Sequence, residues 1–206
     1  MSVVYFCAEC RAKACVRGGD YPPNCPSAQA EQQVRAALAQ TLADPWTRQV
    51  LTAAAATPRH EDGTVRTRVE ELIVFCRQMG YTTLGVAFCV SLARETNALS
   101  ARLHEAGFRL VPVCCTVGGM TLADFGVTQA EKPHAACNPL AQAEILNAQQ
   151  TDVNILVGLC VGHDILFARN SYSPVTTLVV KDRALKHHAV DALRQLPSSA
   201  GAASMA

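Results

Sequence analysis

The sequence predicts an α/β protein, a parallel sheet of about four strands with helices on both faces, preceded by a small N-terminal four-cysteine metal module. From about residue 64, apolar runs of strand length alternate with segments whose apolar residues recur at helical spacing. Three of these runs end in cysteine, and four further cysteines fall within the first 26 residues. Because parallel strands end at one edge of their sheet, we expect the strand-end thiols to meet there in one shared metal site.

The composition limits the classes of partner. Half of the 206 residues are apolar, 17% are charged and the net charge is +1, so we expect neither nucleic acid nor a membrane as partner. The first residues lack the basic start of a signal peptide, and no run reaches the roughly 18 apolar residues of a membrane span, which predicts a cytoplasmic protein. In that reducing compartment, ten cysteines indicate metal binding or redox chemistry before disulfides.

The first 26 residues form the predicted metal module. Its cysteines are Cys7, Cys10, Cys15 and Cys25, and a glycine pair and a proline pair between the last two force tight turns. Four thiols can therefore converge without a hydrophobic core, and the bound metal would supply the missing folding energy. Zinc and an iron–sulfur cluster both accept four thiolates. The alternative is a disulfide-stapled or loose N-terminal arm.

Residues 27–63 are predicted to be a helical linker region. Ser27 is a candidate N-cap for its first helix, and Asp44 followed by Pro45 is a typical start for a second. No residue of this region is a candidate for catalysis.

The parallel α/β domain is predicted over residues 64–196. Its first helix, closed by Gly80, carries Cys76 on its apolar face, so we expect Cys76 to be a small buried hydrophobe and not a ligand. The first strand, residues 84–88, ends at Cys89, and a helix over about 91–106 follows.

The second strand, residues 108–113, ends at the pair Cys114-Cys115. A connection that includes His134 runs from there to about residue 136, and connections of this length are usually functional. It leads to Cys137, directly before a helix that Asn138 can cap. The exposed amides at that helix start would stabilise the thiolate form of Cys137.

The third strand, residues 154–157, opens into a polar segment at the start of a predicted short helix. This segment contains Gly158, Cys160, Gly162, His163 and Asp164. Its two glycines would let a bulky ligand approach the backbone. The fourth strand, residues 175–180, opens into the charged segment Lys181-Asp182-Arg183. A last helix follows, and residues 197–206 are small and polar enough to form a disordered tail.

The candidate site lies where these strands end. The predicted cofactor ligands are Cys89, Cys114, Cys137 and Cys160, with Cys115 as the alternative to Cys114. Thiolates gathered from distant positions suit an iron–sulfur cluster, of the 4Fe–4S type, although zinc would accept the same ligands. The predicted catalytic residues are His163, Asp164, Lys181 and Asp182, with His163 transferring a proton and Lys181 neutralising an anion. The alternative is that the thiols only fill apolar space and the polar residues form a helix cap and a surface charge run.

Several segments together resemble a family of cysteine-rich bacterial and archaeal proteins described only as predicted metal-binding proteins of unknown function. They are Cys7-x2-Cys10, residues 85–89, Cys137-Asn138-Pro139 with the start of its helix, residues 158–164 and Lys181-Asp182-Arg183. The resemblance extends to about residue 190 and implies metal binding without naming a reaction. The chain has Cys114-Cys115 where the family has one cysteine followed by lysine, and His187-His188-Ala189 where the family has His-Asn-Pro.

The sequence thus predicts a metal-binding protein with one or two iron–sulfur clusters, one of which would lie at the strand ends and bind substrate. Such a cluster would support an iron–sulfur lyase or desulfurase that acts on a small molecule. Two alternatives remain open, a zinc-binding, storage or sensing protein without turnover and an electron-transfer protein with a redox partner. The sequence does not fix the oligomeric state.

Overall fold

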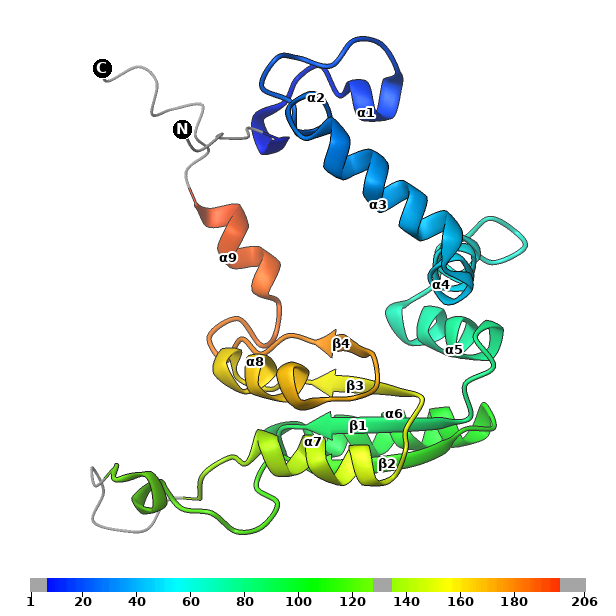
Figure 1. The fold of residues 1–206 in the computed structure, drawn as a ribbon. Helices are drawn as coiled ribbons and strands as arrows, with labels where there is room; N and C mark the ends of the chain where they lie inside the picture. The colour runs from blue at the N-terminus through cyan, green and yellow to red at the C-terminus, as the bar shows by residue number, and fades with distance from the viewer. Residues whose placement is uncertain (1–6, 128–134, 197–206) are drawn as a thin grey trace. The chain divides into compact units, whose positions relative to one another are not determined.

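The computed structural model describes residues 7–127 and 135–196. The chain divides into two compact units, Met1–Ala56 and Thr57–Ala206 (Figure 1). The predicted tail, residues 197–206, and His134 lie outside the described residues.

The larger unit contains a sheet of four parallel strands, which confirms the predicted fold class. The strands are β1 (Thr83–Phe88), β2 (Arg109–Cys114), β3 (Val153–Val157) and β4 (Val175–Val179), in the order β2-β1-β3-β4. Their carboxyl ends therefore lie along one edge, where the arrowheads of Figure 1 point. β1 and β3 are the two central strands of the sheet, and their residues are the most completely buried.

Helices cover both faces of this sheet. One face packs against α5 (Arg68–Gln78) and α6 (Ala93–Glu105), through side chains that include Leu84 and Val86 of β1. The opposite face packs against α7 (Pro139–Ala148) and α8 (Val161–Asn170), and includes Ala87 of β1 (Figure 1). The alternation along β1 explains its uninterrupted apolar sequence, because a strand covered on both faces needs no polar side.

The strand order creates a topological switch point between β1 and β3. From β1 the chain passes through α6 to β2 on one side, and from β3 it passes through α8 to β4 on the other. The two connections leave on opposite faces, so the carboxyl ends of β1 and β3 form the place where open α/β sheets bind ligands.

Several helix starts follow the capping chemistry of the sequence. Asn138 accepts a hydrogen bond from Ala141 N at 2.9 Å and begins α7, and Asp44 accepts one from Thr47 N at 2.8 Å and begins α4 (Pro45–Ala56). Two expected boundaries differ here. Thr67 forms a capping box with Glu70 and begins α5 later than expected, and α8 begins after Cys160, earlier than the start expected at Asp164 or a neighbouring residue.

The smaller unit consists of short helical elements before two longer helices. The elements are η1 (Cys7–Glu9), α1 (Ala14–Arg17), α2 (Pro26–Gln29), α3 (Glu31–Ala43) and α4. Cys25, and not Ser27, is the N-cap residue of α2, because proline at the first helical position fixes the start two residues earlier. The remaining elements of the larger unit are η2 (Val90–Leu92), η3 (Leu122–Phe125) and α9 (Ala189–Gln195).

Gly85 lies at the centre of the sheet against a buried polar network. Thr151 Oγ1 donates to Asn154 Oδ1 at 2.8 Å, and Asn154 Nδ2 donates to Ser171 Oγ at 2.8 Å. A Cβ atom on Gly85 would overlap Asn154 Oδ1 and approach Leu146 Cδ1 to 2.9 Å. Only glycine therefore fits at this position of β1, next to Asn154 of β3.

Pro112 lies in the edge strand β2. The backbone amides of Arg109 and Cys115 donate to Thr82 O and Phe88 O at 2.8 Å each, on the side of β1. Donors alternate along a strand, so the nitrogen of Pro112 faces the free edge and its missing N–H removes no bond to β1.

Among the described residues, no helix is both long and apolar enough to cross a membrane.

Candidate thiol site at the carboxyl edge of the sheet

The strand register brings Cys89 and Cys115 together. Phe88 pairs with Cys114, and Cys115 N donates to Phe88 O at 2.8 Å, so the ladder continues one residue past the strands. Cys89 and Cys115 are therefore in-register neighbours, at a strand spacing of about 4.8 Å. Both thiols are buried in the core on the α7 and α8 face.

Cys137 joins these two thiols from the connection before α7. Asn138 N donates to Cys115 O at 2.7 Å, which holds the start of α7 against the end of β2. The half-buried Cys137 packs against the same core cluster as Cys89 and Cys115. Burial raises the pKa of Cys115 to about 12, and contact with Cys137 and the proximity of Cys89 also raise it. We call Cys89, Cys115 and Cys137 the thiol cluster.

The pKa of Cys89 differs from that of Cys115 because a positive charge lies beside Cys89. Lys181 Nζ donates to Cys89 Sγ at 2.7 Å and to Ser91 Oγ at 3.3 Å, and Ser91 Oγ lies 3.2 Å from Cys89 Sγ. Burial raises the pKa of Cys89, but the hydrogen bonds from Lys181 and Ser91 and the Lys181 charge outweigh it and lower the pKa to about 7. Near neutral pH, Cys89 is therefore the more readily ionised of the two, and Cys115 keeps its proton.

Replacing Lys181 with methionine is expected to slow alkylation of Cys89 at pH 7 by roughly fivefold in the metal-free, reduced protein. Without the ammonium group, burial raises the pKa of Cys89, so the thiolate fraction at pH 7 falls, while the higher basicity of the remaining thiolate offsets part of the loss. The rate is measured by iodoacetamide labelling and mass spectrometry of the Cys89 peptide. The matched control is Arg183→Met, because Arg183 contacts Cys160 and not Cys89. Equal rates in wild type and Lys181→Met would contradict the assignment.

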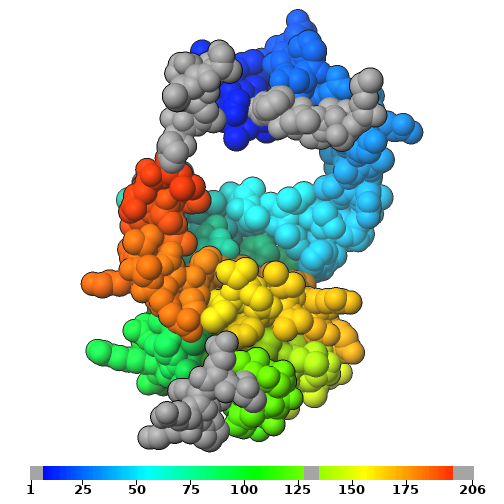
Figure 2. Space-filling model, turned by 90° about the vertical axis from the view of Figure 1, so that its left-hand side faces the viewer, coloured from blue at the N-terminus to red at the C-terminus, as the bar shows by residue number. Residues whose placement is uncertain are grey.

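The other strand-end residues lie around this cluster in different ways. Cys114 Sγ contacts Thr116 Oγ1 at 3.4 Å, and Cys160 Sγ accepts a long contact from Arg183 at 3.9 Å. Figure 2 looks onto this edge, with yellow and orange parts of the chain side by side. Cys114 also packs against the core cluster of Cys89 and Cys115, but the thiol-to-thiol interactions of Cys115 are with Cys137 and Cys89. Of the predicted ligands, Cys89 and Cys137 therefore lie together with Cys115.

Among the predicted catalytic residues, Asp164 is the one with an unpaired buried atom. Its Oδ1 is buried without a hydrogen-bond partner in the described part of the chain, and burial raises its pKa although His163 opposes this. Asp182 instead organises a turn, since its Oδ1 accepts from Leu185 N at 2.9 Å and its carbonyl accepts from His187 N at 2.7 Å. Asp182 therefore positions the segment that carries Lys181.

His187 also lies at the carboxyl edge of the sheet. Its Nδ1 accepts from Asp182 N at 3.2 Å, and its Cε1 lies 4.0 Å from the place of a Cβ on Gly158. Gly158 has φ +64 and such a Cβ would also overlap Leu92, whereas a Cβ on Gly162 would meet nothing within 4 Å. At Gly158 it is therefore the Leu92 side chain that comes close to the backbone, and the predicted approach of a ligand at the two glycines stays a prediction.

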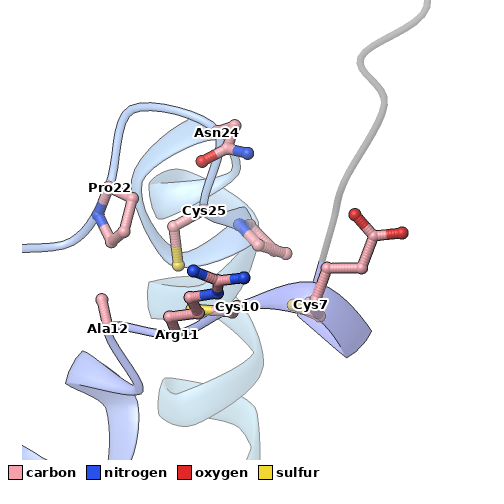
Figure 3. A pocket seen from close by; sticks show the side chains of 9 residues that line it. Cys7, Cys10, Arg11, Ala12, Pro22, Asn24 and Cys25 are labelled. Carbon is pink, nitrogen blue, oxygen red and sulfur yellow. The ribbon is translucent and has the colours of Figure 1, made fainter. Parts of the chain in front are cut away.

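The smaller unit contains a second group of thiols. Cys7, Cys10 and Cys25 line one cavity of about 480 Å³, and Cys10 N donates to Cys7 O at 3.3 Å in the turn between the first two. Figure 3 shows the sulfur of Cys25 pointing toward the chain that carries Cys10 and Arg11. Cys15 is exposed on α1 and does not line this cavity, so three of the four predicted ligands share it.

Neither the thiol cluster nor the cysteines of the smaller unit have the geometry of a metal site as placed. Within residues 7–127 and 135–196, no three His, Cys, Asp or Glu side chains are arranged so that they could hold a metal ion as placed. Free thiols pack as small hydrophobes, and ligation would require them to lose their protons and turn toward a common centre.

Sequence reasoning missed Ser91, assigned no role to His187 and left Cys115 as an alternative. A signal for Cys115 existed in the register, because a strand that ends at Phe88 and pairs in parallel with β2 sets Cys89 against Cys115. The roles of Ser91 and His187 depend on contacts with the segment after β4, for which the sequence offers no periodic pattern.

Comparison with known proteins agrees with the resemblance noted in the sequence. The model of a family described as a protein of unknown function, DUF1847, matches residues 25–178, a range that includes the thiol cluster and ends before Lys181. The uncharacterized protein MJ0455 of Methanocaldococcus jannaschii is 46% identical over 130 residues, which cover 62% of this chain and 67% of that protein. No solved structure matches the chain. The matched range is most of the chain, and the chain therefore belongs to the DUF1847 family of proteins of unknown function.

Proposed function

We propose that this chain binds metal through cysteine thiolates, and that the thiol cluster Cys89, Cys115 and Cys137 is the ligand set of an iron–sulfur centre. The observation that carries the proposal is that three thiols from three separate segments share one buried cluster at the carboxyl ends of the neighbouring strands β1 and β2. Thiolates are the ligands that iron–sulfur clusters require, and ligands supplied by the fold suit a cluster in a binding crevice.

Lys181 supports this proposal through charge. Each bound thiolate adds negative charge to a buried centre, and burying such charge without a partner is unfavourable. The ammonium group 2.7 Å from Cys89 Sγ offsets part of it. A positive donor beside a ligand sulfur is also a means of tuning an iron–sulfur centre, since hydrogen bonds to the sulfurs influence its potential.

Three protein thiolates would leave one metal position open to a substrate. Lyase chemistry, such as dehydration or desulfuration of a small molecule, is what an open iron supports as a Lewis acid. Asp164, whose pKa burial raises, is the candidate proton donor of this reaction, and His163 is the second candidate for proton transfer. We further propose Cys160 as the fourth ligand in the state without substrate. An electron-transfer role would use the same centre without an open position.

A zinc site is the second candidate, and the cavity lined by Cys7, Cys10 and Cys25 favours it. A Cys-x2-Cys turn with a further cysteine at a distance is typical of structural zinc sites, which stabilise small modules without a large core. Iron–sulfur binding at that position is the alternative for the same three thiols.

We propose a cytoplasmic location on the ground that reduced thiols persist there.

The test is the metal and sulfide content of protein purified anaerobically, with visible absorption as a second readout. It is made in a Cys10→Ser background, so that the smaller unit contributes no metal. Cys115→Ala is expected to lose most of the remaining iron and colour, whereas Cys114→Ala, one residue away and in contact with Thr116, is expected to keep them.

Cys76→Ala is the control for nonspecific loss, because Cys76 is fully buried on the opposite face of the sheet and its truncation should cost only about 1 kcal/mol. If the purified protein is colourless and holds zinc, and Cys115→Ala loses that zinc, then the thiol cluster binds zinc and not an iron–sulfur centre. Equal metal content in Cys115→Ala and Cys114→Ala would refute the thiol cluster as the centre.

A further inference from the structure

A cavity of about 520 Å³ lies beside the thiol cluster in the larger unit. It is formed by the connection after β2, the start of α7 and one side of α8, and Cys137 is in its wall. Cavities of this size bind small molecules. Because Cys137 also packs against the core cluster of Cys89 and Cys115, the cavity reaches the thiol cluster from the outside.

The walls of this cavity combine two kinds of surface. Apolar side chains, among them Phe125 and Leu166, form one part. The polar part includes the guanidinium-bearing Arg169, the imidazole of His163 and the amide side chain of Asn138. Within the described residues, none of the side chains that line the cavity is a carboxylate, so the ionisable polar wall is basic.

Arg169 is the charged group on which the argument depends. Its side chain forms no ion pair or hydrogen bond with any residue in the described part of the chain, so its five donors are available to a ligand. A guanidinium group beside an apolar wall matches a ligand that has a carboxylate at one end and an apolar body at the other.

We infer that this cavity binds small organic carboxylates with an apolar body, of about the size of benzoate, next to the thiol cluster. Arg169 pairs with the carboxylate, and Phe125 and Leu166 cover the body. That the bound carboxylate is the substrate of the centre rests on the proposed function, whereas the binding preference itself does not.

The experiment compares benzoate with benzamide, which have the same shape and differ in charge. Binding to the full-length, reduced protein is measured by titration calorimetry or ligand-observed NMR, with and without bound metal. Wild-type protein is expected to bind benzoate about tenfold more tightly than benzamide, and Arg169→Met is expected to abolish the difference. The matched control is Arg94→Met, an exposed arginine of α6 that does not line the cavity and should leave the preference unchanged.

A second readout tests the position of the ligand. Saturating benzoate should slow alkylation of Cys137 in the metal-free protein and leave Cys15 labelling unchanged, because Cys137 lines the cavity and Cys15 lies on α1 of the smaller unit. Equal binding of benzoate and benzamide, absence of benzoate binding, or an unchanged preference in Arg169→Met would each overturn the inference. If benzoate binds with the expected preference but anaerobically purified protein holds no metal, the cavity is upheld and only the proposed metal centre fails.

Discussion

Gly85→Ala is expected to destabilise the α/β unit by about 3 kcal/mol, at the upper end of the cost of overpacking a core. The added Cβ would overlap Asn154 Oδ1 and approach Leu146 Cδ1 to 2.9 Å. Asn154 cannot move aside cheaply, because it accepts from Thr151 and donates to Ser171, and breaking those bonds would leave buried polar groups without partners.

The measurement is the denaturant midpoint of the larger unit under reducing conditions, followed by hydrogen exchange of the β1 and β3 amides. The matched control is Gly162→Ala, the same substitution in α8, where a Cβ meets nothing within 4 Å and φ is not positive. Alanine is the better helix former by about 1 kcal/mol, so this variant should be as stable as wild type or more so. A Gly85→Ala midpoint equal to that of wild type would disprove the packing argument.

Cys10→Ser is the second change with a large expected effect, since it should abolish metal binding at the N-terminal cavity. Cys7, Cys10 and Cys25 line that cavity, and the short elements around it bury little apolar surface. A segment with so small a core depends on its metal for order, so removing one ligand should open it to proteases. The α/β unit should remain folded, because it has its own core.

Limited proteolysis with mass spectrometry, together with zinc and iron analysis, measures this effect in a Cys115→Ala background. Cys15→Ser is the matched control, since Cys15 is exposed and lies outside the cavity, and it should keep metal and protease resistance. If Cys15→Ser loses metal as Cys10→Ser does, all four cysteines are ligands, as the sequence alone predicts. If the segment of Cys10→Ser stays resistant, metal does not stabilise it.

The fold of the larger unit could be predicted because its signals are local. Apolar runs bounded by glycine marked the strands, and the pair Asn138-Pro139 marked the start of α7 through a cap and a proline without a free N–H. The helix before β1 was expected from residue 64, but Val65 forms a bridge with Arg59 and the capping box begins the helix at Arg68. A cap can override an apolar spacing that continues before it.

The site could be predicted only as a region. Side chains alternate faces along a strand, so an uncertainty of one residue at the end of β2 exchanges Cys114 for Cys115, and sequence patterns do not fix strand ends to that precision. Lys181 was expected near the strand ends, yet its contact with Cys89 joins residues 92 positions apart and depends on the path after β4. The basic cavity beside Cys137 depends on which side of α8 faces the connection after β2, and this needs the packed structure.

Pro112 protects this protein against a hazard of its own apolar sequence. The stretch Leu110-Val111-Pro112-Val113 would otherwise be a β-rich edge able to recruit a strand from another molecule, as in aggregation. With the proline nitrogen turned to the free edge, an incoming strand finds no donor at the middle of β2, while the ladder to β1 is intact. Pro112 thus acts as a gatekeeper, and a valine in its place would keep the native sheet but offer a template for fibril growth.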